Sequence, residues 1–177
     1  MEASKKAKHV VSISLGSSKR DAHAMLELGG QKISIERRGT DGDFDKARQL
    51  LERWDGKADA IGLGGTDLYV YAGKKRYTFR ESARLIANVH KTPVLDGSGL
   101  KNSLERKLIQ SLAAGSEVPI RGSKVLLVCA VDRFGMAEAL LEAGAQVIFG
   151  DLIFGLNVNK PLRSLKALSW WAALLQY

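Results

Sequence analysis

The chain has 177 residues, a length that suggests one domain with its own hydrophobic core. Its 45% hydrophobic and 26% charged residues are ordinary for a globular protein, and its single cysteine excludes an internal disulfide. The formal net charge is +8, but the basic residues are scattered and accompany no nucleic-acid motif, which argues against a nucleic-acid-binding protein.

The start of the chain, residues 1–8, is charged and precedes no apolar stretch of signal-peptide length. No run of residues approaches the length that spans a membrane. We therefore expect a cytoplasmic protein with a flexible N-terminal tail over residues 1–8.

The first elements are a buried strand and a hairpin. Residues 9–15 form an apolar run that predicts a strand, and residues 25–28 and 32–36 alternate apolar and polar side chains around Gly29-Gly30. That spacing predicts a β-hairpin. Similar patterns predict, in chain order, a helix over 44–54 that the segment 41–43 can start, a strand over 58–63, a hairpin over 68–79 that turns at Gly73, a helix over 78–90, a strand over 93–96, a strand over 124–131, a helix over 133–143, a strand over 146–151 and a helix over 165–177.

Strands that alternate with helices predict an α/β fold with a mainly parallel twisted sheet, helices on both faces, a Rossmann-like arrangement and β-hairpin insertions. We expect a single α/β domain over 9–177, with a sub-boundary at 113–123 before a Rossmann-like unit over 124–151 that extends the first sheet. The apolar helix over 165–177 is expected to pack in the core or to join subunits of a homo-oligomer.

Polar, glycine-rich loops follow the predicted strands, and in open α/β sheets ligands bind at the carboxyl ends of the parallel strands. These loops are residues 16–19, 64–67, 96–102, 132–133 and 150–151. Glycine lets a backbone approach a ligand, although the same glycines could serve only to turn strands into helices. We expect a cleft for a small-molecule ligand at these loops.

The loop around Lys101 offers backbone donors, a serine hydroxyl and an ammonium group to an oxygen-rich ligand. It is not a P-loop, because the spacing and the Gly-Lys-Ser/Thr ending are absent. A solvated lysine at a helix start is the alternative on spacing alone. Asn102 and Glu105 also have capping-box spacing, which predicts that a helix begins there.

A dinucleotide-binding turn needs three glycines, and on residues 130–135 only the third, Gly135, remains. Asp132 takes the second position, where a carboxylate repels a pyrophosphate, although it can also cap the helix. Asp151 ends the next strand 16 residues after Gly135, where an acid binds the ribose of NAD, and Arg133 could attract a phosphate. NAD or NADP binding and a purely structural turn both stay open.

Other kinds of site find little support in the residues. Cys129 falls inside the strand predicted over 124–131, which favours a buried, inert thiol. No His/Cys cluster has the spacing of a metal site, and the acids near Asp43 lack the full pattern of a calcium loop, so we expect no metal.

Three segments, 11–21, 96–106 and 130–139, resemble a bacterial family usually labelled quinate 5-dehydrogenase. The resemblance implies an NAD(P)-dependent oxidoreductase that transfers a hydride from quinate or a related cyclic polyol acid. It also implies a lysine and an aspartate that act on the substrate hydroxyl, for which Lys101 and Asp67 are the candidates. The candidates to bind the substrate are the polar residues Ser17, Thr66, Ser98 and Asn102.

Two alternatives remain open. The missing glycines favour a non-catalytic binding or regulatory module for a small polar or anionic ligand. The order strand, hairpin, helix, strand over residues 9–63 also matches the start of an actin-like or RNase-H-like fold, but Ser12 and Ser14 stand where such folds hold a metal with an acid.

Overall fold

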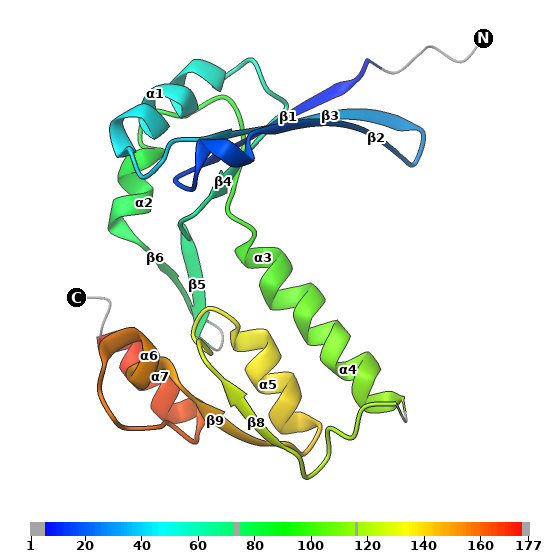
Figure 1. Cartoon of the computed structure of the whole chain (residues 1–177), viewed down its shortest axis with the longest axis vertical. Helices are drawn as coiled ribbons and strands as arrows, with labels where there is room; N and C mark the ends of the chain where they lie inside the picture. The colour runs from blue at the N-terminus through cyan, green and yellow to red at the C-terminus, as the bar shows by residue number, and fades with distance from the viewer. Residues whose placement is uncertain (1–5, 73–74, 116, 175–177) are drawn as a thin grey trace. The chain divides into compact units, whose positions relative to one another are not determined.

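The computed structural model describes residues 6–72, 75–115 and 117–174, which form two compact units (Figure 1). Unit 1 holds residues up to 68 and 78–97, and unit 2 holds 69–77 and 98 onward. The predicted sub-boundary at 113–123 lies inside unit 2, and the single domain over 9–177 stays a prediction. None of the helices in the described part of the chain combines the length and the apolar character of a membrane-spanning segment.

Unit 1 is built on a five-stranded sheet with the order β2-β3-β1-β4-β7. Its strands are β1 (Lys8–Ser14), β2 (Ala22–Leu28), β3 (Gln31–Gly39), β4 (Ala60–Gly64) and β7 (Val94–Leu95). The β1–β3, β1–β4 and β4–β7 pairs are parallel, and the β2–β3 hairpin is antiparallel. The predicted α/β fold with a mainly parallel sheet is therefore confirmed. β1 begins at Lys8, the last residue of the predicted tail.

The helices of unit 1 are η1 (Ser18–Arg20), α1 (Phe44–Trp54) and α2 (Arg80–Leu85). α1 begins after the segment 41–43, as predicted, and the Asp43 carboxylate caps it by accepting a hydrogen bond from the Lys46 N–H at 2.9 Å. α2 begins after Phe79, whose side chain makes no capping bond, and it ends at Leu85. The helix predicted over 78–90 is therefore too long at both ends.

Unit 2 contains a second α/β assembly. Its elements are β5 (Tyr69–Ala72), β6 (Lys75–Thr78, whose last residue belongs to unit 1), α3 (Ser98–Leu100), η2 (Lys101–Glu105), α4 (Arg106–Ala114), β8 (Lys124–Leu127), α5 (Phe134–Glu142), β9 (Gln146–Phe149), α6 (Asp151–Leu156) and α7 (Leu165–Leu174). β5 and β6 pair as predicted, but their turn at Gly73 lies outside the described residues. α3, η2 and α4 follow one another without a break, so the capping box predicted at Asn102 is wrong.

β8 and β9 pair in parallel and form a separate two-stranded sheet. The prediction that this unit extends the first sheet is therefore wrong. A physical reason lies in Phe149 of β9, which exchanges two backbone hydrogen bonds with Leu162, at 2.8 and 3.0 Å. The returning chain thus occupies part of the edge that another strand would need.

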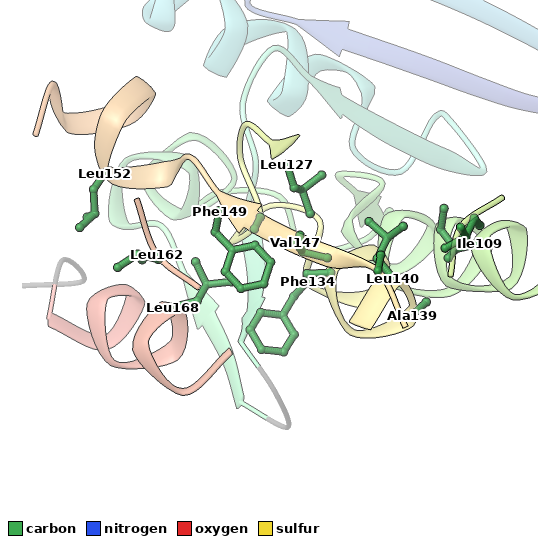
Figure 2. Packing of buried hydrophobic residues seen from close by; sticks show 14 residues of the cluster. Ile109, Leu127, Phe134, Ala139, Leu140, Val147, Phe149, Leu152, Leu162 and Leu168 are labelled. Carbon is green, nitrogen blue, oxygen red and sulfur yellow. The ribbon is translucent and has the colours of Figure 1, made fainter. Parts of the chain in front are cut away.

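The core of unit 2 gathers around Phe149, which is fully buried (Figure 2). Phe134 of α5, Val147 of β9 and Leu168 of α7 belong to the same cluster. α7 therefore buries Leu168 in the core, while Trp170 on the same helix is 59% exposed. Residues 175–177 of the predicted helix lie outside the described residues, and the homo-oligomer through this helix stays a prediction.

Candidate functional site

The carboxyl ends of β8 and β9, with the adjoining η2, form the site that we call the β8–β9 edge. Six predicted residues belong to it: Lys101, Asn102, Asp132, Arg133, Gly135 and Asp151. α5 starts after the turn that follows β8, and α6 starts directly after β9. The edge therefore lies where α/β sheets bind ligands.

Lys101 and Asp132 form an ion pair, with Lys101 Nζ 2.7 Å from Asp132 Oδ1. Their side chains are 25% and 23% exposed, so the pair is mostly shielded but still open to solvent. The ammonium group offsets the carboxylate charge that the sequence places in the turn after β8. The repulsion expected between Asp132 and an anionic ligand is correspondingly weaker.

Two further ion pairs join the α3-η2-α4 helix to α5. Arg133 pairs with Glu105, and Arg106 pairs with Glu138. The guanidinium group expected to attract a phosphate is therefore engaged by a carboxylate. Glu105 was not expected in this role. Its spacing of four from Lys101 places both residues on one helix face only if residues 98–114 form one helix, which the sequence did not indicate.

Gly135 is buried because α5 and η2 approach closely at this point. A Cβ at this position would lie 2.5 Å from the Asn102 carbonyl oxygen and 2.8 Å from its Oδ1. Only glycine fits without a shift of the backbone. The third glycine of the turn thus has a packing role, and the predicted ligand-binding Asn102 lies against it.

Asp151 ties the end of β9 to the turn after β8. Its Oδ1 accepts a hydrogen bond from the Val131 N–H at 2.8 Å. Its Oδ2 is buried and has no hydrogen-bond partner among the described residues. Since a buried acceptor without a donor is costly, this oxygen marks a position where a hydroxyl group would be stabilising.

Cys129 is exposed, because β8 ends at Leu127, and the prediction of a buried cysteine is wrong. Partial burial of the sulfur still raises the pKa of the Cys129 thiol, and the Asp151 and Asp132 carboxylates add to the increase. The thiol is therefore less ionised near neutral pH than an ordinary cysteine.

The other predicted residues lie elsewhere. Ser17 accepts a hydrogen bond from the Lys19 N–H at 3.2 Å and caps η1, while the Thr66 hydroxyl lies 2.7 Å from that of Ser82. Asp67 follows Thr66 in unit 1 and is half-buried. Ser98 is buried at the start of α3.

Lys101 and Asp67 belong to different units. Within unit 2, Lys101 contacts the Asp132 carboxylate. The pairing of Lys101 with Asp67 stays a prediction. Among the described residues, no group of His, Cys, Asp and Glu side chains could hold a metal ion.

Two family models match the chain. Residues 9–96 match a Domain of unknown function (DUF8753), and residues 99–177 match a Domain of unknown function (DUF8754). The two matches meet where the chain passes from unit 1 to unit 2. Neither description names an activity, so the resemblance to quinate 5-dehydrogenases stays a prediction.

No curated protein matches the sequence. Among solved structures, one of the subunits of dipicolinate synthase from Bacillus halodurans is similar at 14% identity, with a TM-score of 0.27. The match covers 85% of this chain and 65% of that chain.

Proposed function

We propose that the β8–β9 edge is the site of an NAD(P)-dependent oxidoreductase that acts on a hydroxyl group of quinate or a related cyclic polyol acid. The observation that carries the proposal is the ion pair of Lys101 and Asp132, at 2.7 Å, at the end of a parallel strand. A lysine and a carboxylate in contact form a couple that can accept a proton from a hydroxyl group. About a quarter of each side chain remains exposed to a substrate.

One side chain of this edge fits a dinucleotide. Asp151 carries the buried Oδ2 without a partner among the described residues, at the end of β9, where an acid accepts hydrogen bonds from a ribose. Backbone N–H groups at the start of α5, together with Asp151, would hold the cofactor without the first two glycines.

A bound nicotinamide supplies the hydride acceptor for this chemistry. Lys101 and Asp132 together act as the general base. Lys101 passes one proton to the Asp132 carboxylate, and its neutral amine then accepts the proton of the substrate hydroxyl. The couple gains one proton as the hydroxyl loses one. Asp67, the aspartate that the resemblance implies, stays a candidate for the same role.

Turnover of quinate with NAD or NADP tests the proposal. We expect Lys101→Ala and Asp132→Asn to lower the turnover rate roughly 10²- to 10⁴-fold, the usual contribution of a general base. Lys107→Ala, which removes an exposed lysine of α4, is the matched control and should leave turnover unchanged. Turnover that survives both changes at the couple would contradict its role.

A non-catalytic binding or regulatory module for a small polar or anionic ligand is the second candidate. The contact of Gly135 with Asn102 favours it, because packing alone accounts for the remaining glycine of the turn. Such a module would bind quinate or a similar anion with an affinity that depends on Lys101. It would neither turn over quinate nor bind a dinucleotide, and these two properties distinguish it from the enzyme.

A further inference from the structure

Strand β2 is the outer strand of the unit 1 sheet and pairs only with β3 among the described residues. All seven of its residues are exposed. They include three large apolar side chains, Met25 at 58%, Leu26 at 39% and Leu28 at 70% exposed. Figure 1 shows β2 and β3 as the long blue hairpin.

Strand β2 lacks the features that usually protect an edge strand from pairing with another strand. Exposed edge strands commonly carry lysine, proline or a bulge, which discourage the addition of another strand. β2 reads Ala-His-Ala-Met-Leu-Glu-Leu, and its pairing with β3 runs from Ala22 to Leu28 without a bulge. A regular, largely apolar strand of this length is ready to pair with another strand.

The hairpin turn decides which backbone groups of β2 face outward. Gly29 and Gly30 have φ values of 57° and 74°, which suit a two-residue turn closed by the hydrogen-bonded pair of Leu28 and Gln31. Because such pairs alternate along an antiparallel ladder, His23, Met25 and Glu27 present their N–H and C=O groups away from β3. These residues can pair with a new strand.

We propose that β2 pairs antiparallel with β2 of a second copy of this chain, across a two-fold axis at Met25. In this register each outward-facing residue meets another, and about six backbone hydrogen bonds form between the copies. His23 lies opposite Glu27 of the second copy, so an imidazole faces a carboxylate.

The same register also matches side-chain sizes across the axis. The two alanines of β2, Ala22 and Ala24, lie opposite Leu28 and Leu26 of the second copy, small against large. A register centred on Glu27 would instead set two carboxylates opposite each other. The sequence of β2 is therefore complementary to itself when the axis passes through Met25.

Sedimentation velocity of the full chain over a wide range of concentration tests the proposal. We expect a reversible dimer. Met25→Pro removes an outward N–H without touching the β2–β3 ladder, and it should raise the dimer dissociation constant at least about tenfold. Trp170→Lys, on the exposed side of α7, is the control and should leave the dimer intact.

A monomer at every concentration would overturn the proposal. So would a dimer that Trp170→Lys abolishes and Met25→Pro leaves unchanged, because that result assigns the interface to α7. Circular dichroism checks that both variants fold.

Should Met25→Pro fail to fold, cross-linking in a Cys129→Ser background decides instead. Met25→Cys should form an intermolecular disulfide, whereas Leu28→Cys, which lies opposite Ala22 of the second copy, should not. Equal cross-linking of the two variants, or none, would contradict the register.

Discussion

The Asp151 carboxylate accepts a hydrogen bond from the Val131 N–H at 2.8 Å and so joins the end of β9 to the turn that follows β8. One oxygen of this carboxylate thus links two segments of unit 2. The other, Oδ2, is buried without a partner among the described residues. A single side chain therefore combines a structural role with the acceptor that we propose for a ribose.

Replacement of Asp151 separates these two roles. Asp151→Ala leaves the Val131 N–H without its acceptor, and we expect it to lower the free energy of unfolding by about 1–3 kcal/mol. Asp151→Asn keeps an acceptor oxygen and should cost less than the alanine. Urea denaturation of both variants measures the difference, and equal losses would contradict the role of the Val131 hydrogen bond.

The contact between Gly135 and Asn102 predicts a second effect on stability. Gly135→Ala places a methyl group 2.5 Å from a backbone oxygen, so we expect a loss of about 1–3 kcal/mol in the free energy of unfolding. Gly155→Ala in α6 is the matched control, because nothing lies within 4 Å of its Cβ position. The control should be neutral or stabilising by up to about 1 kcal/mol. Similar results for the two variants would show that the α5–η2 approach is looser than described.

The hydrogen bonds of Asp55 should make the free energy of unfolding depend on pH in the acid range. Its carboxylate accepts backbone hydrogen bonds from His90, Lys91 and Thr92, at 3.0, 2.8 and 2.7 Å, and the His90 bond contributes most to a lowered pKa of Asp55. Because the folded pKa lies below the unfolded value of about 3.9, this stabilisation is present above that value and is lost as pH falls through the folded pKa. Asp55→Asn should therefore flatten the loss of stability below about pH 4. Denaturation at several pH values checks this, and an unchanged acid dependence would contradict it.

Cys129 should react slowly for an exposed thiol. Partial burial of its sulfur raises the pKa of the thiol, so the reactive thiolate is scarce near neutral pH. We expect its rate with a disulfide reagent at pH 7 to fall below that of free cysteine, and to rise at a higher pH than free cysteine does. A rate equal to that of free cysteine would contradict the raised pKa.

Local signals in the sequence predicted local structure well. The glycines at 29 and 30 predicted the β2–β3 hairpin, and the segment 41–43 predicted the start of α1, because turns and helix starts depend on neighbouring residues. Pairing of β8 and β9 with another sheet could not be judged this way. It depends on Leu162, which closes on Phe149 from a distant part of the chain.

In the candidate site, too, local features were predicted from the sequence and contacts between distant segments were not. The loops after β8 and β9 were found from the sequence because strands end in recognisable turns. The partners of their side chains were not, since Lys101 and Glu105 reach Asp132 and Arg133 across some 30 residues of chain. Residue type and local spacing do not predict which charged side chains form ion pairs across the fold.

Calorimetric titration of the full chain with NAD and with NADP, each with and without quinate, tests the central proposal most directly. We expect NAD to bind in preference to NADP. We also expect Asp151→Asn, which keeps the acceptor for Val131, to weaken NAD binding about tenfold, the effect of one lost hydrogen bond to a charged group. Failure of the folded protein to bind either dinucleotide would contradict the proposed cofactor site, as would NAD binding that Asp151→Asn leaves unchanged.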